Sequence, residues 1–283
     1  MLHISSIDIQ QFVAEWYRRL SVAHLDMSPM TETPLPKGAF SLTHEQQLRA
    51  VPRLFRPYWE SLARRNNYYN NRFMQQWADG LETKLVLEAG CGDASTLGYR
   101  QQKLTRLVGI DPLAEAVGAN SDIRFGTQGV LERLPFADKT FAGIYCDSVF
   151  EHIEDPARVV GEFYRVLEPG GRVIINTNSV FNPFMFPNKF LTVRQREWIK
   201  RKAHIQSEGT FPAPYRINTK RRLVQYLKRA GFTQIQIYRW GVPAMYRPQW
   251  FLVMQLLMEM VAEIPLFAGF KHRLMATCEK PAA

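Results

Sequence analysis

From residue 84 onward, short apolar runs alternate with segments whose apolar residues recur every three or four positions. The runs predict strands and the segments of helical period predict helices. The predicted strands are 85–87, 107–110, 123–125, 141–146, 172–176, 232–240 and 273–278, and the predicted helices are 95–102, 114–119, 156–167 and 220–230. This alternation predicts an α/β fold with a mostly parallel sheet of seven strands and helices on both faces.

Polar and small residues predict where some of these elements end. Asn218 or Thr219 can cap the helix 220–230, and Gly231 ends it. The stretch Glu168-Pro-Gly-Gly predicts a helix stop and a turn before the strand 172–176.

Residues 1–80 differ from the rest because they are predicted to be helical and aromatic-rich. Residues 7–20 suit an amphipathic helix, and the proline-rich stretch 28–41 predicts a loop. Residues 46–77 are mostly of helical pattern, with Pro52 and Pro57 interrupting the first part. We therefore predict a helical N-terminal extension or lid over residues 1–80 and one α/β domain over residues 81–283.

Two long segments, 179–217 and 241–272, interrupt the α/β pattern as insertions. Unusually long connections in such a sheet tend to carry function. Both lie at or beyond strand ends, where ligands of open α/β sheets bind.

An apolar run at residues 249–270 carries Gln255, Glu259 and Glu263 at four-residue spacing, together with Pro265. Two carboxylates and a proline suit a membrane-spanning helix badly. The polar residues form one stripe of an amphipathic helix. Three roles fit that helix: covering the core, pairing with a second subunit as a homodimer, or peripheral contact with a membrane surface.

The charge and the cysteine content indicate which partners and which cellular location to expect. The chain of 283 residues has a formal net charge of +10, which favours anionic partners without choosing among nucleic acid, lipid headgroups and anionic metabolites. Its three cysteines have no metal-ligand spacing, so no metal site is predicted. An odd cysteine count without a secretion signal predicts a reducing, cytoplasmic location.

A glycine-rich turn between two acidic residues is the strongest chemical signal in the chain. The first predicted strand ends at Glu88 and turns through Gly90 and Gly92, and the second ends at Asp111. Glycines let backbone approach a ligand, and the second acid can accept hydrogen bonds from ribose hydroxyls. Ser95 stands where a dinucleotide-binding turn would have its third glycine. The pattern therefore predicts a nucleoside pocket that suits a diphosphate badly.

Four motifs in order give the chain a family resemblance. They are Val86-Leu-Glu-Ala-Gly-Cys-Gly, Val108-Gly-Ile-Asp-Pro, Leu134-Pro-Phe-Ala-Asp-Lys-Thr-Phe-Ala, and Phe150-Glu-His-Ile-Glu-Asp-Pro followed by Arg165-Val-Leu-Glu-Pro-Gly-Gly. Over residues 84–178 the chain resembles class I S-adenosylmethionine-dependent methyltransferases, within the group that includes the ubiquinone/menaquinone and sterol enzymes. The resemblance implies a Rossmann-like fold and S-adenosyl-L-methionine as cofactor.

The resemblance also implies contacts between particular residues and the cofactor. The turn formed by Gly90, Cys91 and Gly92 would lie along the methionine moiety, with Glu88 near its cationic end. Asp111, followed by Pro112, would bind the ribose. The adenine would lie at Val130 and Leu131, and the amino end at Cys146 and Asp147. The family often has an acidic residue at the position of Val130, which binds the adenine amino group. Valine cannot do so, and backbone groups together with Gln128 are the alternative contacts to adenine.

Catalysis by methyl transfer consists mainly of aligning the acceptor with the methyl group and excluding water. A base helps when the acceptor is a hydroxyl or an acidic carbon, and His152 is the predicted base because of its place after the fourth strand. Its alternative role is structural. His204 is a second candidate, with a solvated position as its alternative. Tyr68 and Tyr69 suit either a lid or packing on the sheet.

The first insertion predicts the acceptor site. It combines the apolar stretch 180–187 with the basic run 194–202, and it ends in a segment that contains Tyr215 and Arg216. An apolar wall with a cationic rim suits a small amphipathic or anionic acceptor, and a solvated helix face is the alternative for the basic run. An RNA-modifying methyltransferase and a non-catalytic assembly module are the competing hypotheses. No RNA-binding module is recognisable in the sequence, so nucleic acid is predicted not to be the acceptor.

Overall fold

The computed structural model describes residues 48–49, 51–183, 190–202, 212–243 and 249–282. The predicted helix 7–20 and loop 28–41 lie outside these residues. The division of the chain at residue 80 and the lid role of the extension therefore stay predictions.

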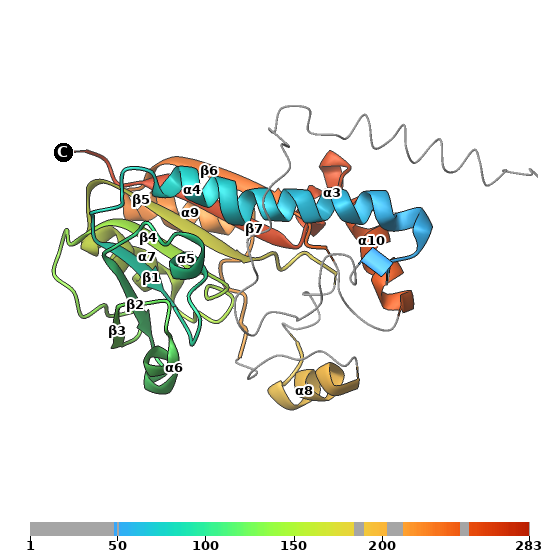
Figure 1. Cartoon of the computed structure of the whole chain (residues 1–283), viewed down its shortest axis with the longest axis horizontal. Coiled ribbons are helices and arrows are strands. Elements are labelled where there is room, and N and C mark those ends of the chain that lie inside the picture. The colour runs from blue at the N-terminus through green and yellow to red at the C-terminus, as the bar shows by residue number, and fades with distance from the viewer. Residues whose placement is uncertain (1–47, 50, 184–189, 203–211, 244–248, 283) are drawn as a thin grey trace, which may run out of the picture.

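Among the described residues, seven strands form one sheet (Figure 1). The strands are β1 Val86–Ala89, β2 Leu107–Asp111, β3 Phe125–Gln128, β4 Phe141–Asp147, β5 Leu167–Asn178, β6 Thr233–Trp240 and β7 Arg273–Glu279. Their order is β3-β2-β1-β4-β5-β7-β6. The pairs among β1 to β5 are parallel, and β7 runs antiparallel to both β5 and β6. The predicted α/β fold with a mostly parallel, Rossmann-like sheet is confirmed.

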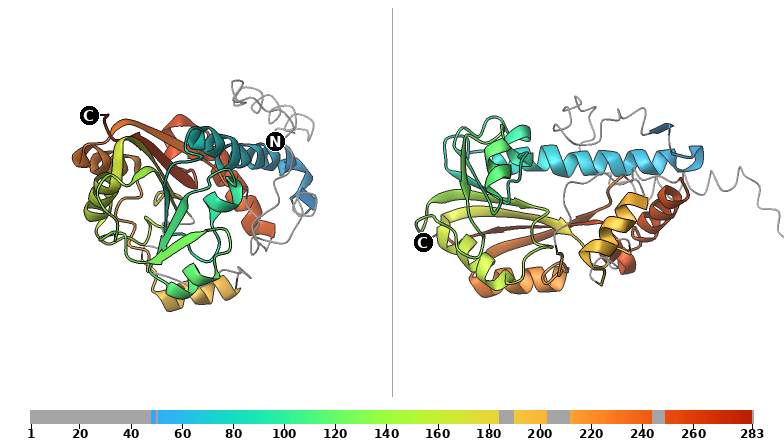
Figure 2. Two further views of the ribbon diagram at one scale, coloured as in Figure 1. Left: turned by 60° about the vertical axis from the view of Figure 1, so that its left-hand side comes forward. Right: turned by 90° about the horizontal axis from the view of Figure 1, so that it is seen from below.

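Helices cover both faces of this sheet (Figure 2, right). They are α3 Arg56–Asn67, α4 Met74–Ala78, α5 Thr96–Arg100, α6 Ala114–Ala119, α7 Pro156–Val166, α8 Val193–Lys202, α9 Lys220–Ala230 and α10 Gln249–Val261, with the 3-10 helices η1 Arg53–Phe55 and η4 Pro265–Phe270 and the π-helix η2 Tyr68–Phe73. α7 and α9 bury apolar side chains in one core cluster with β4 and β5. α4 and α5 belong to a second cluster on the other face. The two-sided cover keeps ligand access at the strand ends.

Local sequence accounts for the ends of several elements. The Thr219 side chain accepts a hydrogen bond from the Arg222 backbone N–H, and Gly231 ends α9 in a left-handed conformation with φ of 99°. Both positions agree with the sequence prediction. Pro57 lies in the first turn of α3, where the backbone N–H that proline lacks would have no partner within the helix.

Two strands differ from their predicted bounds. β3 begins at Phe125, whereas the sequence predicted a strand over 123–125, because β3 is an edge strand whose side chains are mostly exposed and leave little apolar pattern. β5 already pairs with β4 at Leu167, before the predicted turn. The partners pass from Phe141 and Leu167 to Gly143 and Arg172, so the predicted turn 168–171 is a bulge within β5.

The polar stripe of α10 faces the protein interior. Gln255 and Glu259 are 2% and 1% exposed. Beyond the helix, Glu263 accepts hydrogen bonds from the Tyr58 hydroxyl at 3.1 Å and from an Arg65 guanidinium nitrogen at 2.7 Å, both on α3. The Lys271 ammonium also binds Glu263. Buried carboxylates need such partners because removal from water disfavours their charged form. The stripe thus ties α10 and its following turn to α3.

The opposite side of α10 exposes apolar side chains. They are Trp250, Met254, Leu257 and Val261, continued by Ile264 just beyond the helix, and they are between 38% and 65% exposed. Their spacing alternates between four and three residues, so they form one stripe along the helix. We call this set the α10 apolar stripe. Of the described helices, none has the length and apolar character needed to cross a bilayer.

Glu263→Ala is expected to destabilise the protein by about 3–5 kcal/mol, because it leaves the buried cations Arg65 and Lys271 without their shared carboxylate. Urea unfolding followed by circular dichroism measures the loss. The control is Glu60→Ala, which removes an exposed ion pair with Arg64 at 3.9 Å and should cost less than about 1 kcal/mol. Equal losses in the two variants would contradict the proposed role of the buried network.

Candidate active site

The carboxyl ends of β1, β2 and β4 bring the predicted site residues to one edge of the sheet. Glu88 pairs in register with Gly109 and with Tyr145, so the turns after the three strands lie next to one another. The backbone N–H groups of Gly90 and Cys91 both donate to the Ile110 carbonyl, at 2.8 and 3.1 Å. We call the edge of the sheet at which β1, β2 and β4 end the carboxyl edge.

The two glycines of the first turn serve different purposes. Gly90 has a φ of 79°, and a Cβ there would lie 2.2 Å from the Val149 Cγ2. Gly90 is therefore required by close packing as well as by its backbone conformation. Gly92 has a φ of 55°, and no atom lies within 4 Å of where its Cβ would be. The open side of Gly92 leaves room for a ligand to approach the backbone.

Asp111 is the half-buried acid at the end of β2. One carboxylate oxygen accepts from the Gly92 N–H and the other from the Leu113 N–H, both at 3.0 Å. Each oxygen keeps a further lone pair, so the fixed carboxylate can still accept ribose hydroxyls. The Asn120 side-chain amide braces the turn by donating to the carbonyls of Cys91 and Gly92 at 3.1 and 3.0 Å.

Glu88 lies beneath the turn and is 4% exposed. Its carboxylate accepts from the Ser95 hydroxyl and, at 3.2 Å, from the Leu97 N–H at the start of α5. Burial raises the pKa of Glu88 to about 7, although the hydrogen bonds from Ser95 and Leu97 oppose the rise. Glu88 therefore anchors α5 to the turn, and its contact with the cofactor's amino end stays a prediction.

The predicted adenine region lies after β3. Val130 is 50% exposed, whereas Leu131 is 3% exposed and belongs to the core. The Gln128 side-chain amide donates to the Pro112 carbonyl at 3.0 Å, so Gln128 joins the turn after β2 to the end of β3. Of these residues, Val130 offers the most exposed apolar surface for an adenine ring.

Asp147, at the end of β4, is held by a guanidinium from the far part of the chain. Arg273 donates to an Asp147 carboxylate oxygen at 2.9 Å, and the Tyr145 hydroxyl donates to the other at 3.0 Å. Arg273 also donates to the Ser148 hydroxyl and to the Asn178 side-chain oxygen, at 2.9 and 3.1 Å. The role of Arg273 was not predicted from the sequence, because nothing local marks a residue that meets its partner across the sheet.

The two cysteines assigned to the site are buried thiols. Burial raises the pKa of the Cys91 thiol to about 12, and it raises the pKa of the Cys146 thiol well above its usual value. Neither thiol is therefore a thiolate nucleophile near neutral pH. Any role of Cys146 in holding the cofactor falls to its backbone. Among the described residues, no three metal-ligating side chains lie together.

A second buried acid, Glu151, organises the loop after β4. It accepts from the Thr177 hydroxyl at 2.6 Å and from the Asn178 side-chain amide at 2.8 Å, both at the end of β5. The Asn218 amide donates in turn to the Thr177 hydroxyl at 2.6 Å. Burial raises the pKa of Glu151, while its hydrogen bond to Thr177 and the charge of Arg273 oppose the rise.

His152 follows Glu151 and is exposed. Its Nδ1 lies 2.7 Å from the Pro212 carbonyl oxygen. Because a carbonyl oxygen only accepts, Nδ1 carries the hydrogen in this contact. In the neutral imidazole the lone pair then lies on Nε2. The end of the first insertion thus fixes the tautomer that leaves Nε2 able to take up a proton.

The predicted acceptor residues are distributed unevenly. Tyr215 is 4% exposed, has a φ of 51°, and donates its N–H to the Glu151 carbonyl at 3.2 Å. Arg216 is exposed and forms an ion pair with Glu154 at 2.9 Å. The structure therefore brings residues 212–216 against the loop that carries His152. His204 lies outside the described residues, so its role stays a prediction.

Tyr69 packs on the face of the sheet, at the end of β6 where Trp240 pairs in register with Arg273. Its ring stacks on Trp240 with centroids 4.5 Å apart and also contacts Tyr238 on β6. This is the helix-on-sheet packing that was one of the two alternatives for Tyr69.

Comparisons with known proteins indicate the class of this domain. Residues 87–175 match a family described as "Methyltransferase domain". A tRNA U34 carboxymethyltransferase from Nautilia profundicola is 26% identical over 60% of this chain and 62% of its own length. A ubiquinone/menaquinone biosynthesis C-methyltransferase from Desulfotalea psychrophila is 31% identical over 36% of this chain and 44% of its own length. The chain thus spans less than two thirds of these curated relatives.

A solved structure shares the fold. The S-adenosylmethionine-dependent methyltransferase from Mesorhizobium loti aligns with a TM-score of 0.51 and 14% identity, over 74% of this chain and 96% of the other. The fold, the carboxyl edge and the matched family define residues 87–175 as part of a class I S-adenosylmethionine-dependent methyltransferase domain. Its cofactor is S-adenosyl-L-methionine, and the open side of Gly92 and the fixed carboxylate of Asp111 fit that ligand.

The raised pKa of Glu88 predicts a pH dependence of stability. The carboxyl is neutral in both states below about pH 4.5, and above that value the unfolded state ionises first, so stability falls until the folded group ionises near pH 7. A shift from 4.5 to about 7 corresponds to a loss of about 3 kcal/mol.

Glu88→Gln, which cannot ionise, should flatten this fall. Thermal unfolding of both proteins between pH 5 and 8 measures the difference, with Glu197→Gln as the exposed-carboxylate control. The same pH profile in wild type and Glu88→Gln would contradict the prediction.

Proposed function

We propose that the protein transfers a methyl group to an O, N or C atom of a small amphipathic or anionic acceptor. The observation that carries this proposal is the packing of residues 212–216 against the loop of His152. The chain itself thereby builds a wall beside the carboxyl edge, where a small molecule can be oriented.

When bound, S-adenosyl-L-methionine supplies a methyl group on a sulfonium, which is an activated leaving group. The turn at Gly92 and the carboxylate of Asp111 would hold it, and its methyl group would pass to the acceptor atom while the electron pair of the carbon–sulfur bond stays on sulfur. The main task of the protein is to align the acceptor and keep water out. Where the acceptor is a hydroxyl or an acidic carbon, its proton must pass to a base.

His152 is the proposed base. The Pro212 carbonyl fixes Nδ1 as a donor, so Nε2 has the lone pair that accepts the proton. Glu151, buried beneath the same loop, holds the backbone there through Thr177 and Asn178. The site therefore has a base in a set tautomer on a braced loop.

The described part of the first insertion supports the proposed acceptor class. Phe181, Phe190 and Trp198 are 51%, 69% and 56% exposed, and Arg194 is exposed on the same helix as Trp198. Exposed aromatic rings with a nearby cation suit a ligand with an apolar body and an anionic group. The name of the Desulfotalea psychrophila relative, which refers to quinone biosynthesis, agrees with an amphipathic acceptor.

An RNA acceptor is the second candidate, favoured by the net charge of +10 and by the name of the tRNA-modifying relative. The discriminating experiment supplies radiolabelled cofactor to the small-molecule, lipid and RNA fractions of a cell lysate. Label in a small molecule or lipid, identified by mass, supports the proposal. Label confined to RNA, with salt-sensitive RNA binding, would replace it. Failure to bind the cofactor in calorimetry would favour a non-catalytic module.

His152→Asn is expected to lower kcat at least about 100-fold, because the asparagine amide has no basic nitrogen to accept a proton in place of Nε2. The amide of asparagine can still donate to the Pro212 carbonyl, so the loop and the cofactor affinity should be retained. Cofactor-dependent methylation and calorimetric titration measure the two effects.

His152→Ala is the matched variant because it removes both the base and the hydrogen bond. If His152→Asn keeps full turnover while His152→Ala loses it, His152 positions the loop and is not the base.

The α10 apolar stripe supports a homodimer, as one of the alternatives for residues 249–270. Its alternating spacing is that of helices that pack against each other. α10 contains no lysine or arginine, whereas helices that lie on anionic lipid are rich in them. The stripe also carries no charge, so two copies can approach there despite a net charge of +10 each.

Light scattering after size exclusion should give twice the chain mass for the wild type. Leu257→Glu should give a monomer, while Phe125→Glu, an equally exposed apolar residue on β3, should leave the dimer intact. A monomeric wild type that sediments with anionic vesicles would instead support the membrane alternative.

A further inference from the structure

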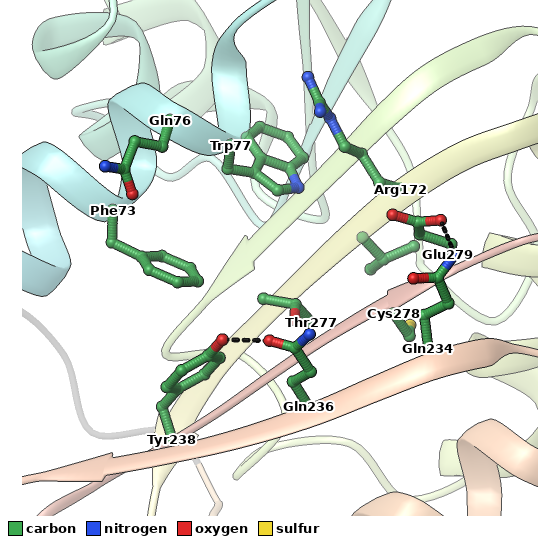
Figure 3. A pocket seen from close by; sticks show the side chains of 11 residues that line it. Phe73, Gln76, Trp77, Arg172, Gln234, Gln236, Tyr238, Thr277, Cys278 and Glu279 are labelled. Carbon is green, nitrogen blue, oxygen red and sulfur yellow. Dashed lines mark hydrogen bonds between the residues drawn. The ribbon is translucent and has the colours of Figure 1, made fainter.

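A pocket of about 240 Å³ lies between α4 and the antiparallel part of the sheet (Figure 3). Its walls come from η2 and α4 on one side and from β5, β6 and β7 on the other. Arg172, where the pairing of β5 with β7 begins, is in register with Glu279 at the end of β7, whereas Asn178 and Arg273 are paired at the opposite ends of the two strands. The pocket therefore opens at the amino-end edge of the parallel strands, away from the carboxyl edge.

The polar lining of this pocket departs from what a covered sheet face requires. A face beneath a helix is normally apolar. Ile235 and Ile237 of β6 follow that rule on the other face, where they pack against the core cluster that contains α9. On the α4 side, β6 presents Gln234, Gln236 and Tyr238 to the pocket.

A distortion of β6 shapes the pocket wall. Between Thr233 and Gln236 the strand has one residue more than its partner β7, and Gln234 has a φ of 50°. Such bulges redirect side chains and are frequent beside binding sites. Gln234 consequently donates to the Glu279 carboxylate at 2.9 Å, and Tyr238 donates to the Gln236 carbonyl oxygen. The bulged strand thus holds its polar groups around the pocket rim (Figure 3).

The pocket lining offers two hydrogen-bond donors, one from α4 and one from β5, that the described residues do not satisfy. The Trp77 indole nitrogen and the Arg172 Nε are buried and have no acceptor among the described residues. Trp77 is 7% exposed, and the Arg172 guanidinium lies 5.9 Å from its ring centroid. Another Arg172 nitrogen donates to the Asp79 carbonyl, which keeps the guanidinium in place. Buried donors without an acceptor are rare in folded proteins, and they indicate that an external acceptor belongs there.

We propose that this pocket binds a small aromatic monocarboxylate as a second ligand, separate from the methyl-transfer site. Its carboxylate accepts hydrogen bonds from the Trp77 indole and from Arg172 at the inner wall. Its ring lies among Phe73, Trp77 and Tyr238, whose aromatic surfaces suit a flat apolar body. The volume fits a single ring with one carboxylate and is smaller than a typical drug-sized site.

The Glu279 carboxylate sets the charge that the pocket accepts. It lies beside Arg172, its register partner on the neighbouring strand, and accepts a hydrogen bond from Gln234 (Figure 3). A second negative group on the ligand would meet Glu279, so a monocarboxylate is favoured over a dicarboxylate. A neutral amide of the same shape would accept weaker hydrogen bonds from the two donors.

Saturation-transfer NMR on the full chain with benzoate, benzamide and phthalate tests the proposal. Benzoate should bind with a Kd in the millimolar range or tighter, and benzamide and phthalate should bind at least about fivefold more weakly. S-adenosylhomocysteine should not displace benzoate. No benzoate binding, equal binding of the three probes, or displacement by S-adenosylhomocysteine would overturn the assignment.

Two variants locate the site. Trp77→Phe keeps an aromatic ring and removes the indole N–H, and Arg172→Gln removes the cation; each should weaken benzoate at least about fivefold. Arg106→Gln removes an exposed cation outside the pocket and should have no effect. If Arg172→Gln does not fold, Trp77→Phe alone decides. Unchanged benzoate affinity in the folded variants would overturn the proposal.

Discussion

The guanidinium of Arg273 is the contact on which the carboxyl edge depends. It brings β7 to the ends of β4 and β5 by binding Asp147, Ser148 and Asn178 at once. Asp147 and Glu151 place two acids at this edge, and Arg273 is the cation whose charge acts on both. Without that charge, two carboxylates with little access to water would repel each other at the proposed cofactor site. The antiparallel direction of β7 is what puts Arg273 at this end of the sheet.

A second buried network, which joins α3 to the segment that follows α10, obeys the same physical rule. Arg65 and Lys271 surround Glu263, and Lys271 lies 3.9 Å from Glu259. Burial raises the pKa of Glu259 to about 7, although Lys271 opposes the rise. Because these polar groups require partners inside the protein, α10 turns its apolar stripe outward. The arrangement inverts what hydrophobicity alone would favour, and a surface otherwise costly to expose is thereby kept available for contact.

The sequence predicted the parts of the fold that depend on near neighbours. Gly90, Gly92, Asp111 and the capped helix α9 are local features, in which a few adjacent residues determine the backbone. The hydrogen bonds that Arg273, Asn120 and Asn218 make were not predicted, because they arise only when distant segments meet across the sheet. The sequence likewise left open whether the polar stripe of α10 faces the interior or the solvent, since helical period reveals a stripe but not which side is buried. Residues 168–171 leave the regular strand pairing, as their turn-forming residues predict. The pairing of β5 with β4 nevertheless begins at Leu167, before the predicted turn.

The position of Arg273 in the chain has a consequence for synthesis. The Asp147 and Arg273 that pair at the carboxyl edge are 126 residues apart in sequence. At typical rates of elongation, roughly 6–25 s separate the synthesis of the two residues. During that interval the strands β1 to β5 can pair in order while their acidic edge lacks its counter-charge. A nascent chain of this protein therefore passes through a stage with a nearly complete sheet and an unneutralised edge, at which a chaperone or the cofactor itself would have most to stabilise.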